Sequence, residues 1–184
     1  MKQRLKLIVP VLIVMLASST NFSKGGEYKE CVAVVAVSDA ESKIKFQKSL
    51  RDLTVRENRR FAELANLNME LQVALAKSRR IRLLHLLRTD TTRLNTTGSM
   101  SKFTNFGWSA EDTARLAETD AQFEAITQKI SELKSTIKGH PDWPALHKFV
   151  LEVLNKHSEF ATLIAQLNKA RDLGARRLGD CRSR

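Results

Sequence analysis

Apolar residues recur at three- and four-residue spacing over most of the chain, and this spacing is typical of amphipathic helices. Between Asp39 and Leu94 there is neither glycine nor proline, so the pattern predicts one long helix over about 39–94. Two further helices are expected over about 110–138 and 145–178. Their apolar stripes include Phe46, Leu50, Leu53, Leu64, Leu67, Leu71, Phe123, Ile126, Ile130, Leu133, Phe160, Ile164, Leu167 and Ala170. The fold class is therefore expected to be all-α.

Local signals place the ends of these helices. Ser38–Glu41 and Ser109–Asp112 both have the form of an N-terminal capping signal. Residues 95–108 are rich in Gly, Ser, Thr and Asn, which indicates a loop. Gly139 fits a helix C-terminus, and Pro144 fits the first turn of the next helix. A single helical domain is thus expected over 38–181.

The N-terminus has the pattern of a secretory signal peptide. Lys2, Arg4 and Lys6 form a basic start, an apolar run follows over 7–16, and small residues end it at Ser19. The apolar run is shorter than the roughly 20 residues that span a bilayer. We expect cleavage near Ser19 and a periplasmic or secreted protein.

The segment between the signal and the first long helix is short. Residues 20–30 are polar and contain glycine, which predicts a flexible lead-in. Cys31–Val37 is a β-branched apolar run, which is compatible with either a strand or a buried first helical turn. We therefore expect residues 20–37 to stand outside the main helical domain.

Cys31 and Cys181 lie at the two ends of the predicted mature chain. In an exported protein an even cysteine count favours a disulfide. The midpoint between the two lies in the 95–108 loop. A long antiparallel, coiled-coil-like hairpin would bring the cysteines together, with that loop as its tip and Pro141–Pro144 as an elbow in the return arm.

The alternative fold is a compact three- or four-helix bundle. In it the Pro141–Pro144 segment reverses the chain, and the first helix breaks near Glu57–Arg60, where charge interrupts the apolar stripe. Four shorter helices would also bring Cys31 close to Cys181. The sequence leaves both arrangements open.

Charge adds two candidate contact surfaces. The whole chain carries a net charge of +11, which falls to about +8 once the three bases of residues 1–19 are removed. The segment 77–93 is basic and includes Arg79, Arg80 and Arg82, whereas 111–132 is acidic. The two segments are expected to pair across the arms, and the alternative role of the arginines is to bind an anionic surface. Export argues against nucleic acid as the partner.

The second candidate surface is aromatic. Phe103, Phe106 and Trp108 lie in or beside the predicted loop. Aromatic side chains exposed on a loop are candidates for contact with a partner protein. The alternative is that they fold inward and close the end of the helices.

No motif for chemistry is present in the sequence. There is no HExxH, CxxC, GxSxG or glycine-rich phosphate loop, so no metal, cofactor or catalytic residue is expected. The four histidines are not spaced as metal ligands. The sequence favours a non-enzymatic protein.

The outline resembles that of periplasmic holdase chaperones. The Skp type has helical arms after a short β segment, in the position that Cys31–Val37 occupies here, and the Spy type carries an LTxxQ motif, from which Leu53–Glu57 departs at its last residue. The resemblance is one of architecture, and it implies a chaperone-like role with a protein partner or unfolded client. The alternative is a structural or assembly subunit of a cell-envelope machine. Helical seams also allow a homo-oligomer.

Overall fold

The computed structural model describes residues 24–97 and 99–183. The chain is all-α, and the described ranges contain no strand. The predicted signal peptide and its cleavage near Ser19 lie outside these ranges. The α-helices are α1 (Lys24–Glu57), α2 (Ala62–Thr89), α3 (Met100–Thr104), α4 (Ala110–Thr119), α5 (Ala121–Gly139), α6 (Trp143–Glu152) and α7 (Ser158–Asp180). Short 3₁₀ helices follow or separate them: η1 (Arg59–Phe61), η2 (Thr91–Arg93), η3 (Leu154–Lys156) and η4 (Cys181–Ser183).

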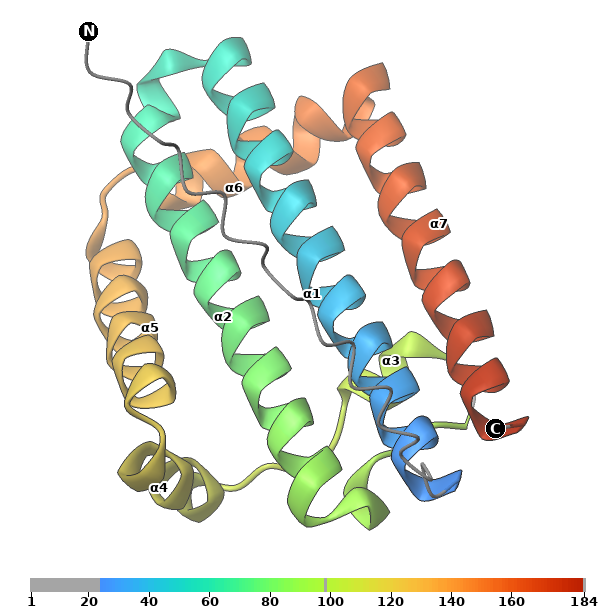
Figure 1. Cartoon of the computed structure of the whole chain (residues 1–184). Helices are drawn as coiled ribbons and strands as arrows, with labels where there is room; N and C mark the ends of the chain where they lie inside the picture. The colour runs from blue at the N-terminus through green and yellow to red at the C-terminus, as the bar shows by residue number, and fades with distance from the viewer. Residues whose placement is uncertain (1–23, 98, 184) are drawn as a thin grey trace, which may run out of the picture.

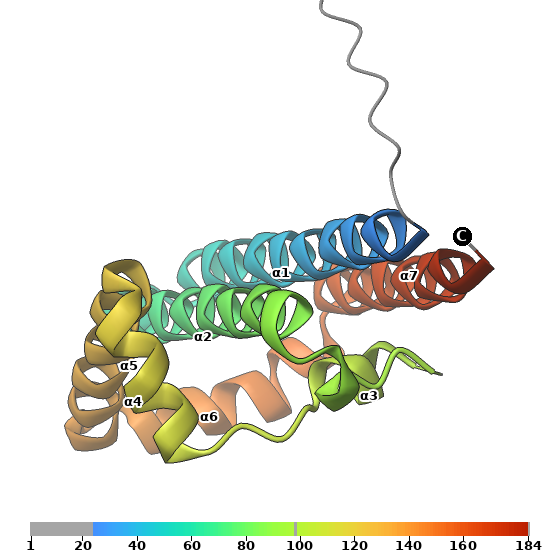
Figure 2. The same cartoon turned by 60° about the horizontal axis from the view of Figure 1, so that its bottom comes forward.

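Four of the helices stand side by side in the order α5, α2, α1 and α7, each antiparallel to its neighbour (Figure 1). Helix α6 crosses one end of this row and connects α5 to α7, and the segment that contains α3 crosses the other end. Figure 2 shows α3 and α6 on the same side of α1 and α2. The fold is therefore a row of helices with one face bridged at its two ends.

The expected single helix over 39–94 is wrong, because the chain turns back on itself at Asn58. This residue is extended (φ −153°, ψ 99°), and its side-chain oxygen accepts a hydrogen bond from the Arg60 backbone N–H at 3.1 Å. Asparagine at this position satisfies a backbone donor that would otherwise lack a partner at a helix start. A continuous rod would leave its apolar stripe exposed, whereas the turn lets α1 and α2 bury theirs against each other.

Residues 24–37 do not form a separate lead-in. Helix α1 begins at Lys24 and includes the apolar run, with Val32, Val35 and Ala36 buried at helical spacing. The Ser38 signal is consequently not a helix start, and its carbonyl accepts the hydroxyl of Ser42 one turn later. Cys31–Val37 is therefore helical and not a strand. Its buried side chains belong to the same apolar cluster as Leu83, Leu86 and Leu87 of α2.

The second and third predicted helices are each divided by a side-chain cap. Asp120 accepts a hydrogen bond from the Phe123 N–H at 2.9 Å and starts α5. The His157 Nδ1 accepts the Glu159 N–H at 3.3 Å, so His157 is the N-cap at which α7 starts. The Ser109 capping box and Pro144 in the first turn of α6 are as predicted.

The expected long hairpin with a proline elbow does not form. Its tip would lie far from the cysteines, but the loop lies at the same end as they do: the Tyr28 hydroxyl bonds the Thr96 hydroxyl at 3.1 Å, and Arg182 donates to the Thr96 carbonyl. The chain at Pro141–Pro144 leads into α6, which crosses the row. The arrangement is closer to the expected alternative, in which the first helix breaks near Glu57–Arg60.

The buried side chains gather at the two ends of the row. At the disulfide end they come from α1, α2, the 94–103 segment and the end of α7. At the other end they come from α2, α5, α6 and η1. A smaller group, Ile81, Leu116 and Phe123, lies under α4 and the start of α5. Between the two ends, the α1–α7 seam is covered far less.

Candidate functional site

The Cys31–Cys181 disulfide joins the first helix to the end of the last. The two Cα atoms are 5.6 Å apart, and the residues are separated by 150 positions in the chain. The Cys181 side chain is fully buried among Val32, Leu178 and their neighbours. The C-terminal end of α7 is thereby attached to α1 both covalently and by apolar contact.

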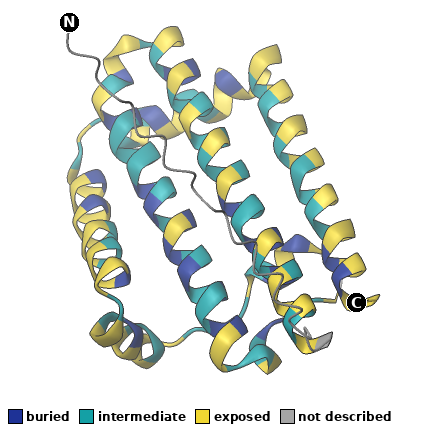
Figure 3. Ribbon diagram, in the orientation of Figure 1, coloured by how far each residue is buried: buried dark blue, intermediate teal, exposed yellow. Residues whose placement is uncertain are grey.

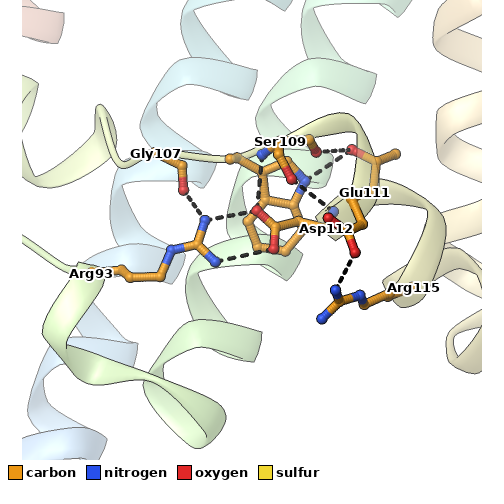
Figure 4. Close-up of polar contacts among 8 residues, drawn as sticks. Arg93, Gly107, Ser109, Glu111, Asp112 and Arg115 are labelled. Atoms are coloured by element: carbon orange, nitrogen blue, oxygen red, sulfur yellow. Dashed lines mark hydrogen bonds and ion pairs between the residues drawn. The ribbon is translucent and has the colours of Figure 1, made fainter.

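A charged contact fixes the loop that follows α2. The Arg93 guanidinium donates to both carboxylate oxygens of Asp112 at 3.1 and 2.7 Å and also reaches the Gly107 carbonyl (Figure 4). The Arg93 bonds, with a further bond from the Ser109 backbone N–H, hold the pKa of Asp112 well below its usual range. The contact holds the start of α4 against the end of α2.

Trp108 packs between two arginines at this end of the molecule. The guanidinium carbons of Arg82 and Arg93 lie 5.6 and 5.7 Å from its ring centroid, within range of a cation–π contact. Its indole N–H donates to the Thr113 hydroxyl at 2.9 Å, and the Phe106 ring is 6.1 Å away at a steep angle. The sequence predicted these arginines and aromatics separately, and the structure brings Arg82, Phe106 and Trp108 together.

The aromatic candidates therefore point inward rather than outward. Phe103 is completely buried in the core at the disulfide end and offers no surface to a partner. Phe106 and Trp108 are partly buried and pack against the same core. Of the two predictions for this loop, the structure agrees with the one in which the aromatic side chains fold inward and close the end of the helices.

The basic candidates on α2 have three different surroundings. Arg82 is engaged with the aromatic rings, and burial together with the nearby charge of Arg79 lowers its pKa. Arg79 lies near the ammonium of Lys43 on α1. Arg80 is partly exposed. In the described part of the chain only Arg93 and Asp112 form an ion pair between the segments 77–93 and 111–132, so the expected pairing of these segments is largely absent.

The seam between α1 and α7 is only partly buried. From 41 to 52 no residue of α1 is buried, and from 158 to 177 no residue of α7 is buried. Figure 3 shows α7 in intermediate and exposed colours along most of its length, with burial at its C-terminal end. Leucine and phenylalanine side chains that face α1 are thus only half covered.

A groove of about 300 Å³ lies along this seam. Its apolar lining is Phe46 on α1 with Leu163, Leu167 and Ala170 on α7, and Lys45 is its only charged residue. We call this surface the α1–α7 groove. Ser42, Ser49 and Gln166 complete the lining, so the groove combines apolar side chains with polar groups and one base.

Contacts with neighbouring elements hold both ends of α7, whereas no residue of its middle part is buried. At its start, Arg56 pairs with Glu159, and the His157 Nε2 lies 3.6 Å from the Glu57 carboxylate. Near its end, Gly174 permits close approach of α3, because a Cβ there would lie 3.1 Å from the Met100 sulfur. The groove therefore lies on a helix held at its two ends.

The histidines of the described ranges have structural surroundings. Across 24–97 and 99–183, no group of three or more His, Cys, Asp or Glu side chains is placed to hold a metal ion. His140 and His157 accept backbone N–H groups, and His85 lies edge-on to Trp108. Among the helices within 24–97 and 99–183, none is both long enough and apolar enough to cross a membrane.

The apolar spacing predicted part of the groove lining. Phe46, Leu167 and Ala170 belong to the predicted stripes, whereas Leu163 lies outside them. Helical spacing shows which residues share a face, but it carries no information on how completely a neighbouring helix covers that face.

Comparison with known proteins returned no match: no protein-family model, curated protein or solved structure is significantly similar to this chain.

Proposed function

We propose that the chain is an exported, non-enzymatic helical binding protein that holds apolar segments of an unfolded protein client in its α1–α7 groove. The observation that carries the proposal is the 20-residue stretch of α7, from 158 to 177, in which no residue is buried. At 1.5 Å per residue this stretch is about 30 Å long. On the side that faces α1, Leu163, Leu167 and Ala170 of this stretch line the groove, and a partly open apolar lining is a candidate site of interaction.

Export is supported by two features of different kinds. The pattern of residues 1–19 is that of a secretory signal peptide. The Cys31–Cys181 disulfide suits an oxidising compartment, such as the periplasm or the extracellular space. The proposed location is therefore periplasmic or secreted.

Charge indicates which clients suit the groove. Without residues 1–19 the chain has a net charge of about +8, and Lys45 lines the groove itself. Attraction between opposite charges speeds the encounter of two proteins, and repulsion between like charges disfavours their binding. An acidic unfolded protein with exposed apolar segments is the proposed client.

The aggregation of an acidic client protein that is diluted from urea without any reductant tests the proposal by light scattering, since a reductant would also open the Cys31–Cys181 disulfide. The protein is expected to suppress aggregation at roughly equimolar amounts. Leu167→Asp should abolish most of the suppression, because it places a charge in the apolar lining. Leu173→Asp is the matched control, since Leu173 is on the same helix, does not line the groove and is 46% exposed. Equal suppression by the two variants would contradict the proposal.

A second candidate function is a structural or assembly subunit of a cell-envelope machine. Leu151 and Val153 favour it, because these neighbouring side chains are 56% and 49% exposed at the turn between α6 and η3. A small fixed apolar surface of this kind suits one folded partner. Absence of any suppression by the unaltered protein would favour this second role.

A further inference from the structure

The two halves of the Cys31–Cys181 disulfide differ in exposure. Cys181 is completely buried at the end of α7, in the apolar cluster that contains Val32 and Leu178. Cys31 on α1 packs against the same cluster but is only partly buried. A reagent in solution therefore reaches the disulfide from the Cys31 side, because apolar side chains cover the Cys181 side.

A hollow of about 250 Å³ borders Cys31. Its lining consists of Cys31, Val34 and Val35 on α1 with Arg177 and Asp180 on α7. Cys181 is not part of this lining. The Val34 side chain is 61% exposed, whereas Val35 is buried, so the hollow has an apolar wall that opens to solvent. We call it the Cys31 hollow.

The chemistry of disulfides gives this asymmetry a consequence. A thiolate opens a disulfide by attacking one of its two sulfurs, and access decides which sulfur is attacked. A thiolate in the Cys31 hollow forms a new S–S bond with the Cys31 Sγ, and the bond between Cys31 and Cys181 breaks. Its electron pair passes to the Cys181 Sγ, which leaves as a thiolate and takes up a proton from water. The external thiol is thereby oxidised and Cys181 is reduced.

We propose that Cys31 is a thiol-exchange site, at which an external thiol forms a mixed disulfide with this protein. The proposal rests on two observations, that Cys31 lines an open hollow and that Cys181 is completely buried. Thiol–disulfide exchange is reversible and passes through the same mixed disulfide in both directions. In an oxidising compartment, an external disulfide would therefore close the Cys31–Cys181 bond through a mixed disulfide at Cys31.

Exchange at Cys31 also frees the end of α7, the helix that forms one wall of the α1–α7 groove. Over 158–177 no residue of α7 is buried, so after exchange Leu178 and other noncovalent contacts alone hold this end. At the other end of α7, the ion pair of Arg56 with Glu159 is exposed and adds little. Exchange should therefore expose more of the apolar groove lining. This effect on the groove rests on the proposed function, whereas the exchange site does not.

Peptide mass spectrometry of the full disulfide-bonded protein after brief incubation with glutathione tests the exchange site. The reaction is stopped early with N-ethylmaleimide, and the protein is digested with trypsin without reduction. The cysteines fall in separate peptides, 30–43 and 178–182. Glutathione is expected on Cys31 at least about tenfold more often than on Cys181, because access selects the sulfur. Glutathione mainly on Cys181, equally on both or on neither would overturn the proposal.

A bulky side chain in the Cys31 hollow tests the route of attack. Val34→Trp should slow formation of the mixed disulfide at least about threefold, because it narrows the access to Cys31. Glu41→Trp is the matched control, since Glu41 is an exposed residue of α1 outside the hollow, and it should change the rate less than about twofold. Equal rates for the two variants would contradict the route. Circular dichroism checks their folding, and the peptide assignment uses the unaltered protein.

The aggregation assay separates the exchange site from its effect on the groove. Protein that carries glutathione on Cys31 and N-ethylmaleimide on Cys181 should suppress client aggregation at a lower molar ratio than the disulfide-bonded protein, because more apolar lining is open. Equal suppression by the two forms would contradict the effect on the groove. Absence of suppression by both forms would contradict the proposed function, while the peptide assignment would still decide the exchange site.

Discussion

Replacement of both Cys31 and Cys181 by serine is expected to lower the free energy of unfolding by about 4–5 kcal/mol. The disulfide closes a loop of 150 positions, and the loss of chain entropy in the unfolded state grows with loop length. The expected effect on α7 is larger than on the rest of the fold, because its middle is only half covered by α1.

Urea unfolding followed by circular dichroism measures this change, and hydrogen exchange locates it. The amides of α7 should exchange faster in the double serine variant, while those of α2 keep most of their protection. The reduced unaltered protein is the control and should match the variant. A loss below about 1 kcal/mol, or uniform exchange across all helices, would show that the disulfide does not hold α7 in place.

Phe103→Ala is expected to lower the free energy of unfolding by about 3–4 kcal/mol. Phe103 is completely buried against Met100, Leu178 and Cys181, so its removal leaves a cavity where the loop, α2 and α7 meet. The size of the effect separates a core residue from an exposed contact residue, since exposed positions usually change stability by less than about 0.5 kcal/mol.

Lys102→Ala is the matched control for Phe103→Ala. Lys102 is the preceding residue of the same short helix and is exposed. The free energies of unfolding of the two variants, measured by urea titration, should therefore differ by most of the loss expected for Phe103→Ala. Similar midpoints would mean that the loop does not contribute to the core, and the aromatic residues would again be candidates for partner contact.

Features that depend on a few neighbouring residues were predictable from the sequence. The Ser109–Asp112 capping box and Pro144 in the first turn of α6 lie where the pattern placed them. Such signals work because the side chain and the backbone group it satisfies are within one turn of each other. The cysteine pair was predictable from compartment and count, and the structure joins the two residues.

Features that depend on tertiary burial were not predictable. The 39–94 segment has a helical pattern throughout, and asparagine at position 58 is an inconspicuous break. The chain turns there because α1 and α2 bury more apolar surface against each other than a single rod would. Val32, Val35 and Ala36 join α1 for the same reason, since α2 and Phe103 cover that face.

The candidate site likewise combines features that the sequence predicts locally with contacts that depend on the tertiary fold. The arginines and aromatics near the loop were recognisable from the sequence, but the contact of Arg82 with Trp108 depends on how the loop folds back. Contacts of this kind follow only from the tertiary fold.

Photo-crosslinking from the α1–α7 groove tests the central claim most directly. A benzophenone side chain replaces Leu167 in one variant and Leu173 in another, and each is irradiated with α-lactalbumin that has been reduced and carboxymethylated, so that no reductant is present to open the Cys31–Cys181 disulfide. The account predicts a covalent adduct from position 167, which lines the groove, and background yield from position 173, which does not. Equal yields from the two positions, or no adduct from position 167, would contradict it.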